Sequence, residues 1–127
     1  MQYIILLTGC INPNGMAFTA LTDATIRLKQ YVTAINYYLN NTNYPIVFSE
    51  NSGTSINSYF NSYNNNKRLE LLSFKGNNNK DRGKGYGEAE IIDYALKKSL
   101  IIESHKNNCS IIKITGRLIV RNIMELT

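Results

Sequence analysis

The sequence is poor in the residues that most protein metal sites and disulfide frameworks use. It has one histidine, His105, and two cysteines, Cys10 and Cys109, with no Cys-x-x-Cys pair. This set is too small for a zinc site of cysteine and histidine ligands or for a disulfide network. One histidine in a polar segment also gives no Ser-His-Asp or Cys-His arrangement for nucleophilic catalysis. We therefore expect reduced thiols, a cytoplasmic protein and no metal ligands in this chain.

Charge and long apolar runs are limited as well. Charged residues make up 18% of the chain, and 14 Lys and Arg against 9 Asp and Glu leave a net charge of +5. The cations are interspersed with acids and form no basic stripe, so we expect no nucleic-acid partner. No apolar run approaches the ~20 residues of a membrane-spanning helix, so we expect no integral membrane segment. Peripheral attachment to the inner face of a membrane is left open.

A chain of 127 residues with 43% hydrophobic residues fits one globular domain with its own core. The sequence stops at Met124–Thr127, which resembles the start of a helix with no helix after it. We therefore expect residues 1–127 to form a single domain that is the N-terminal part of a longer protein.

Short apolar runs alternate with amphipathic segments along the chain. The runs that predict strands are Tyr3–Leu7, Pro45–Phe48, Leu69–Phe74 and Ser110–Val120, the last broken by Gly116. Helical spacing of apolar residues predicts one helix from Thr22, as its N-cap, to Leu39, and a second from about Glu88 to Leu100. Gly76–Gly87 is dense in Gly, Asn and Lys and is predicted to be a surface loop. This order predicts an α/β fold, a Rossmann-like three-layer α/β/α open sheet that is mostly parallel.

Small or polar residues follow each predicted strand. In an open α/β sheet, ligands bind outside the carboxyl ends of the strands. Four segments are expected at that edge: Thr8-Gly9, Glu50-Asn51, Lys75–Glu88 and Thr115–Arg117. Their coincidence at one edge is the main indication of a binding site.

The Arg82–Glu88 segment has two interpretations. Its glycines would let the backbone approach a ligand, and Arg82 and Lys84 would bring positive charge to a diphosphate. It is not a dinucleotide fingerprint, because Glu88 occupies the third glycine position counted from Gly83. On spacing alone, a phosphate-binding loop and a flexible loop before a helix both remain open.

Three charged side chains could anchor a ligand at the same edge. Glu50 or Glu88 could accept hydrogen bonds from ribose or sugar hydroxyls, although Glu88 could equally stabilise the start of a helix. The guanidinium group of Arg117 could bind phosphate with two nitrogens, with an ordinary salt bridge as the alternative.

The order of these segments carries a family resemblance. The matching segments are Ile5–Gly9, Thr22-Asp23, Ile26–Leu28, Tyr31, Pro45–Ser52, Gly83–Glu88, Ile91–Leu96 and Lys113–Arg117. Together they resemble the N-terminal part of a family of bacterial glycosyltransferase-like proteins from capsule and cell-surface polysaccharide loci.

The resemblance implies a GT-A-like domain, truncated in this chain, that binds a nucleotide-diphospho-sugar donor for hexosyl transfer to a saccharide or lipid-linked acceptor. It also implies two groups of ligand contacts. Those on the nucleoside side are Thr8, Gly9, Glu50 and Asn51, and those at the diphosphate are Lys84, Gly85, Gly87 and Arg117.

Such transferases usually hold Mn²⁺ or Mg²⁺ with an Asp-x-Asp motif, which this sequence lacks. Either the metal ligands lie beyond Thr127, or basic residues neutralise the leaving diphosphate without a metal. Whether this chain is itself an enzyme therefore stays open. The alternative is a non-catalytic nucleotide or sugar-phosphate binding module, or a fragment without its catalytic part. The exposed edges of a short sheet would also allow pairing between chains, so a homo-oligomer is open too.

Overall fold

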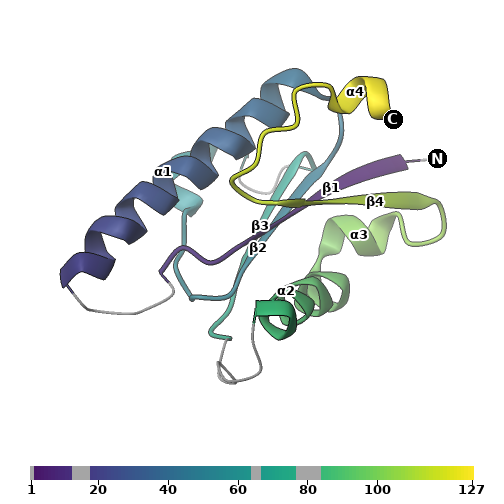
Figure 1. Cartoon of the computed structure of the whole chain (residues 1–127). Coiled ribbons are helices and arrows are strands. Elements are labelled where there is room, and N and C mark those ends of the chain that lie inside the picture. The colour runs from purple at the N-terminus through teal and green to yellow at the C-terminus, as the bar shows by residue number, and fades with distance from the viewer. Residues whose placement is uncertain (1, 13–17, 64–66, 77–83) are drawn as a thin grey trace.

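The computed structural model of the chain contains a four-stranded parallel sheet between two layers of helices (Figure 1). The structure describes residues 2–12, 18–63, 67–76 and 84–127. The strands are β1 (Gln2–Gly9), β2 (Ile46–Glu50), β3 (Leu69–Ser73) and β4 (Cys109–Thr115). They lie in the order β3-β2-β1-β4, and each neighbouring pair is parallel. The predicted α/β class with its parallel sheet is confirmed.

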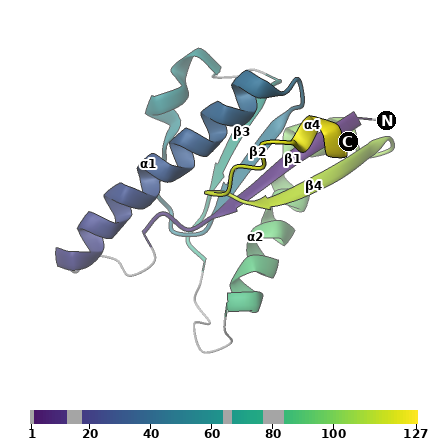
Figure 2. The same ribbon diagram turned by 45° about the horizontal axis from the view of Figure 1, so that its top comes forward.

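The helices divide between the two faces of the sheet (Figures 1 and 2). The long helix α1 (Phe18–Asn41), the 3-10 helix η1 (Asn57–Tyr63) and the short α4 (Ile123–Leu126) pack on one face, here called the α1 face. Helices α2 (Lys84–Lys98) and α3 (Leu100–Ser104) pack on the other, the α2 face. None of the described helices combines the length and the hydropathy needed to cross a bilayer.

Strand β1 is central, and its side chains contribute to both apolar layers. Ile5 and Leu7 belong to the cluster on the α1 face, whereas Ile4 and Leu6 belong to the cluster on the α2 face. All four are at most 1% exposed. This double burial explains why the strand has a continuous apolar sequence rather than an alternating one.

Two predicted helix starts are wrong. Helix α1 begins at Phe18 rather than at Thr22, which therefore lies inside the helix and is not its N-cap. Helix α2 begins at Lys84 rather than near Glu88, so the last part of the predicted surface loop is helical. Before Thr22, Ala20 and Leu21 are good helix formers, so the helix extends through them. Before Glu88, the first turn of α2 contains Gly85 and Gly87 despite their low helix propensity.

Two predicted ends are also wrong. The strand region expected over Ser110–Val120, with a break at Gly116, ends at Thr115. The break at Gly116 is confirmed, but the strand does not resume after it. The helix expected to reach Leu100 ends at Lys98, because Ser99 begins a new helix by accepting a hydrogen bond from the Ile102 amide at 3.0 Å. A serine at this position serves as an N-cap, which is its usual role beside a helix.

The segment after β4 returns along α1, where the Tyr38 hydroxyl binds it. This hydroxyl donates to the Leu118 carbonyl at 2.7 Å and accepts from the Val120 amide at 3.0 Å. Desolvation raises the pKa of Tyr38 above its usual 10.0, because the buried site disfavours the phenolate. The folded chain therefore holds this proton at a pH where the unfolded chain loses it.

We expect Tyr38→Phe to lower the free energy of unfolding by about 1–2 kcal/mol at neutral pH, because two backbone groups lose their partner. The stability linked to the Tyr38 proton is complete below the unfolded pKa of 10.0 and is lost as pH rises through the folded pKa. The variant should therefore lose less stability than the wild type between neutral and strongly alkaline pH. Urea unfolding at both pH values measures this. Tyr37→Phe is the control, because the Tyr37 hydroxyl makes one exposed bond, to Arg121. Equal losses in the two variants would contradict the assignment.

Candidate functional site

The order of the strands reverses between β1 and β4. From β1 the chain builds β2 and then β3 to one side, with connections on the α1 face, and then crosses on the α2 face to place β4 on the other side. In open α/β sheets the ligand crevice lies outside the carboxyl ends of the strands at such a reversal. The candidate site is therefore the edge formed by Thr8 and Gly9 of β1 and by Thr115 and Gly116 at the end of β4; we call it the carboxyl-edge site.

Three hydroxyl side chains form a row across this edge. The register pairs Thr8 with Ser49 on one side and with Thr115 on the other. Aligned residues of neighbouring strands share a face of the sheet, and here it is the α2 face. The Thr8 hydroxyl donates to Glu88 Oε1 at 2.9 Å, and the Ser49 hydroxyl donates to the Ile91 carbonyl at 3.2 Å. These bonds hold the first half of α2 against the carboxyl edge.

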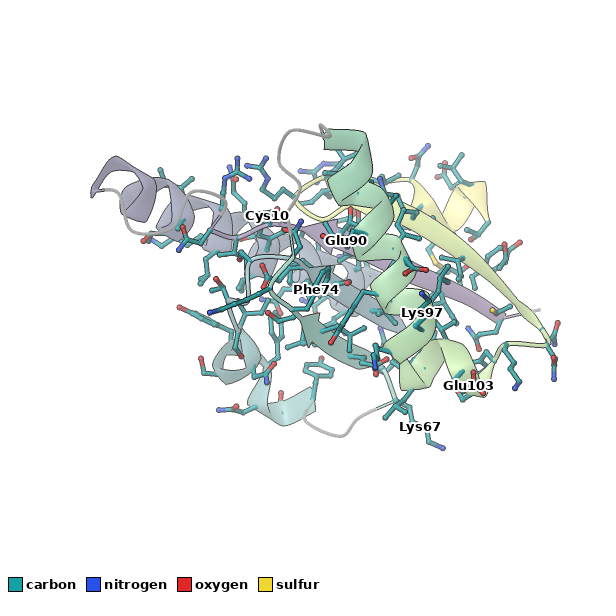
Figure 3. The ribbon with its side chains drawn as sticks, turned by 90° about the horizontal axis from the view of Figure 1, so that it is seen from below. Cys10, Lys67, Phe74, Glu90, Lys97 and Glu103 are labelled. Carbon is teal, nitrogen blue, oxygen red and sulfur yellow. The ribbon has the colours of Figure 1, made fainter. Side chains whose placement is uncertain are left out.

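A stacked aromatic pair supports the same placement of α2. The Phe74 ring, just after β3, lies 4.2 Å from the Tyr94 ring between centroids, with the planes 16° apart. In Figure 3, Phe74 and Glu90 lie beside the middle of α2, and Lys97 and Glu103 lie further along the helical layer. The second half of α2 is therefore held beside the end of β3.

Two cations flank the ends of β1 and β4, one on each face. Lys113 of β4 forms an ion pair with Glu88 of α2, and about a third of each side chain is exposed. Arg117 turns to the α1 face, where it donates to Gln30 Oε1 at 3.0 Å and its guanidinium carbon lies 5.9 Å from the centre of the Tyr31 ring. The site therefore has positive charge on both sides, and these are the groups that bind phosphate oxygens.

Two glycines make room for Tyr31 at this edge. The Gly116 amide donates to the Thr8 carbonyl at 2.7 Å, and a Cβ at Gly116 would lie 2.6 Å from that oxygen and 2.9 Å from the Tyr31 ring. A Cβ at Gly9 would lie 2.7 Å from the same ring. The Tyr31 hydroxyl in turn accepts a hydrogen bond from the Cys10 amide at 2.9 Å. Any larger residue at either glycine would displace the ring or the strand ends.

Glu50 lies inside the edge rather than on it. The residue is 1% exposed and accepts five hydrogen bonds from its own chain. Oε2 accepts from the Ile11 amide at 3.3 Å and from the amide and hydroxyl of Ser52, while Oε1 accepts from the Thr54 amide at 2.7 Å and the Ser73 hydroxyl. These five donors use all the hydrogen-bond acceptor sites that a carboxylate offers. In this arrangement Glu50 connects the loops after β1 and β2 to the end of β3.

Two asparagines at the same edge have buried acceptors. Asn51 is 5% exposed, and its amide donates to the Gly9 carbonyl at 3.1 Å. The Asn12 amide donates to the Ser52 hydroxyl at 3.1 Å. For the Oδ1 atoms of both residues the described part of the chain supplies no hydrogen-bond partner. Buried acceptors without a partner are uncommon, and a ligand with N–H or O–H donors would satisfy them.

The remaining predicted residues lie in the first turn and a half of α2. Lys84, Gly85 and Gly87 belong to the helix, which continues through Glu88 to the contact with Thr8. Arg82 and Gly83 lie outside the described residues. Contact of Lys84, Gly85 and Gly87 with a diphosphate stays a prediction. The helix that contains them reaches the carboxyl-edge site through Glu88.

The described acidic residues at this edge do not fit a divalent metal. Glu50 accepts five hydrogen bonds, and Glu88 is paired with Lys113. Nowhere in residues 2–12, 18–63, 67–76 and 84–127 do three or more His, Cys, Asp or Glu side chains gather closely enough to hold a metal ion.

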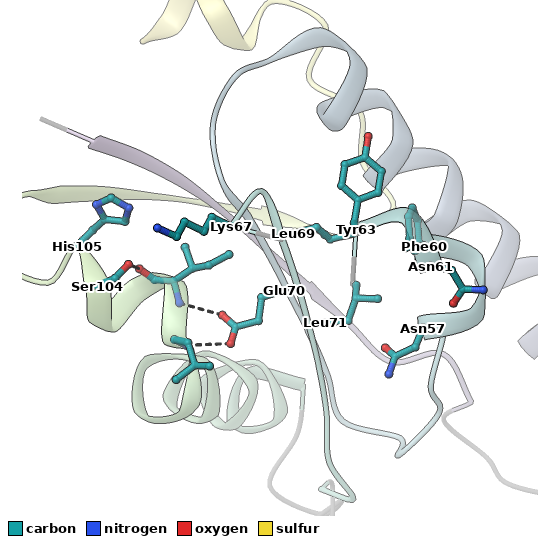
Figure 4. Close-up of a pocket in the computed structure, with 12 residues that line it drawn as sticks. Asn57, Phe60, Asn61, Tyr63, Lys67, Leu69, Glu70, Leu71, Ser104 and His105 are labelled. Atoms are coloured by element: carbon teal, nitrogen blue, oxygen red, sulfur yellow. Dashed lines mark hydrogen bonds between the residues drawn. The ribbon is translucent and has the colours of Figure 1, made fainter. Parts of the chain in front are cut away.

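A groove of about 800 Å³ lies elsewhere, along the outer edge of β3 between η1 and α3 (Figure 4). Glu70 points to the start of α3, where it accepts from the amides of Leu100 at 2.8 Å and Ile101 at 3.2 Å. Its charge is therefore compensated by the backbone amides of α3, and the lining also contains the ionisable residues Tyr63, Lys67 and His105. The groove shares no lining residue with the carboxyl-edge site.

Sequence reasoning missed four residues of the site: Asn12, Tyr31, Ser49 and Lys113. Lys113 and Ser49 each interrupt an apolar strand close to its carboxyl end, which was a usable signal. Tyr31 has the spacing of an ordinary core residue of a helix, and nothing in its sequence context indicates that its ring covers the two glycines.

We expect Glu50→Gln to lower the free energy of unfolding by about 2–4 kcal/mol, because the new amide nitrogen faces donors and charge-assisted bonds are lost. Glu103→Gln is the matched control, since Glu103 is exposed and its ion pair with Lys106 should contribute less than about 1 kcal/mol. Urea unfolding at neutral pH measures both. If Glu50→Gln is as stable as the control, the carboxylate does not hold this edge together.

Comparisons with protein-family models, with curated proteins and with solved structures found no match to this sequence.

Proposed function

We propose that the chain binds a nucleotide-diphospho-sugar at the carboxyl-edge site, as the donor-binding part of a glycosyltransferase-like protein of polysaccharide biosynthesis. The observation that carries this proposal is the reversal of strand order between β1 and β4, with a cation on each side of it. In sheets of this kind the reversal is where phosphorylated nucleotides bind.

The diphosphate side is supported by the charges at the edge. A nucleoside diphosphate brings two or more negative charges, which need cations and hydrogen-bond donors. Lys113 and Arg117 supply the cations, and Thr8 and Thr115 add hydroxyl groups at the strand ends on the same face as Lys113. The start of α2 adds the positive end of a helix dipole at the same edge. Charge-assisted bonds of this kind are the stronger ones in proteins.

The nucleoside side is supported by the two asparagine acceptors. Asn12 and Asn51 each have a buried Oδ1 without a described partner, and a base or ribose carries the N–H and O–H donors that would fill them. Glu50 supports this side indirectly, because it fixes the loops on which both asparagines lie. This differs from direct contact between Glu50 and the ribose, which its five internal bonds oppose.

A non-catalytic nucleotide or sugar-phosphate binding module is the second candidate. The observation that favours it is that Glu50 and Glu88, two acidic residues that the structure places at the edge, already have partners within the chain. Transfer to a saccharide or lipid-linked acceptor needs a group that takes the proton of the acceptor hydroxyl. His105 lines the β3 groove instead of this edge. Both candidate functions include binding of a phosphorylated nucleotide or sugar at this edge.

We expect the folded chain to bind at least one of UDP, GDP and CDP, and to bind CMP more weakly because it has one phosphate fewer. Arg117→Ala should lower the affinity for the diphosphate by about tenfold or more, because a charged hydrogen bond to phosphate contributes about 1.5–3 kcal/mol. Isothermal titration calorimetry measures both effects.

Arg121→Ala is the matched control, because it removes the same charge from the segment that follows Arg117 by four positions. Circular dichroism verifies that both variants are folded. Equal affinities in the two variants, or no binding of any of the four nucleotides to the folded chain, would contradict the proposed function.

A further inference from the structure

We propose that Glu88 is an internal competitor for the phosphate-binding position, and that Lys113 exchanges this carboxylate for a phosphate group when the ligand binds. The inference rests on the proposed function and deepens it, because it names the cation that binds phosphate and the residue that opposes binding.

The contacts of Glu88 are the ones that a phosphate oxygen would make. Its carboxylate is paired with the Lys113 ammonium group and accepts a hydrogen bond from the Thr8 hydroxyl at 2.9 Å. An ammonium donor together with a hydroxyl donor is a common environment for an ionised phosphate oxygen. The carboxylate therefore already occupies a small anion site at the end of β1.

The position of Lys113 favours this interpretation over an ordinary surface ion pair. Lys113 is aligned with Leu6 of β1, which is 1% exposed and belongs to the apolar cluster of the α2 face. Two residues further on, Thr115 is aligned with Thr8 at the strand ends. Lys113 lies on the outer strand β4 and is exposed, and its ammonium group reaches the ligand-binding edge because its partner Glu88 also contacts Thr8 there.

The exposure of the pair allows the exchange. The side chains of Lys113 and Glu88 are 37% and 36% exposed, so water and a ligand can reach both. Partly exposed pairs of this kind are weak, and a ligand with two or more negative charges can replace a single carboxylate. A ligand phosphate would then bind Lys113 and Thr8, and Glu88 would turn to solvent.

The exchange predicts effects of opposite sign at the two partners. Glu88→Gln keeps the size of the side chain and can still accept the Thr8 hydrogen bond, but it releases Lys113 and removes a repelling charge. Affinity for a diphosphate should therefore rise. If Glu88 instead accepted ribose hydroxyls directly, the same substitution should lower affinity. The sign of the change separates the two roles.

The test is calorimetric titration of the full chain with inorganic pyrophosphate and with the tightest-binding nucleoside diphosphate. We expect Glu88→Gln to bind both about fivefold more tightly and Lys113→Met to bind both about tenfold more weakly. Asp93→Asn is the matched control, because it makes the same change in charge on α2, and Asp93 also pairs with a lysine, Lys97, at 2.9 Å. Its affinity should stay within about twofold of the wild type. If Glu88→Gln is not folded by circular dichroism, Glu88→Ala takes its place.

The outcomes separate the two proposals. Nucleotide binding by the wild type with unchanged or lower affinity in Glu88→Gln overturns the exchange and leaves the proposed function standing. Unchanged affinity in Lys113→Met likewise overturns the exchange. Absence of binding in the wild type and in every folded variant overturns the proposed function itself, and the exchange with it.

Discussion

The carboxyl edge of this sheet depends on one buried carboxylate. Glu50 accepts hydrogen bonds from the loop after β1, from the loop after β2 and from the end of β3, and it does so at 1% exposure. Chain segments without regular structure leave backbone N–H groups unpaired, and those groups must find acceptors when they are buried. A single carboxylate supplies the acceptors for three amides and two hydroxyls here. It therefore sets the shape of the loops that carry Asn12 and Asn51.

The neighbouring half of the edge is organised by close packing. Gly9 and Gly116 end the two strands at the reversal, and the Tyr31 ring covers both. On the opposite face the row of hydroxyl groups and the Glu88–Lys113 pair hold the start of α2. The two halves have different consequences for function. The Glu50 carboxylate has all its partners within the chain, whereas the Glu88–Lys113 pair is partly exposed, and we propose that a ligand replaces it.

The sequence predicts the elements well where packing and periodicity agree. The continuous apolar run of β1 follows from burial on two faces, and the spacing of apolar residues in α1 follows from burial on one. The class of fold could be derived from these patterns, and so could the position of Thr8 and Gly9 at the carboxyl end of β1. Boundaries were less predictable, because local preferences did not decide them: Gly87 lies inside α2 despite the low helix propensity of glycine.

Side-chain roles at the site could not be derived for a different reason. A glutamate after a strand, such as Glu50, has the same sequence context whether it turns inwards to backbone amides or outwards to a ligand. The pairing of Glu88 with Lys113 joins residues of different elements and exists only once α2 has packed on the sheet. The packing of the Tyr31 ring against Gly116 likewise exists only in the folded chain.

The central claim is that ligands bind where the strand order reverses, and amide chemical-shift mapping by NMR tests it most directly. Titration of the labelled chain with a nucleoside diphosphate should shift the amides of Thr8, Gly9, Asn51 and Gly116, together with those at the start of α2. The amides along the β3 groove, such as those of Leu71 and His105, should stay unchanged. Shifts confined to the groove, or no shifts in a well-folded chain at saturating nucleotide, would contradict the account.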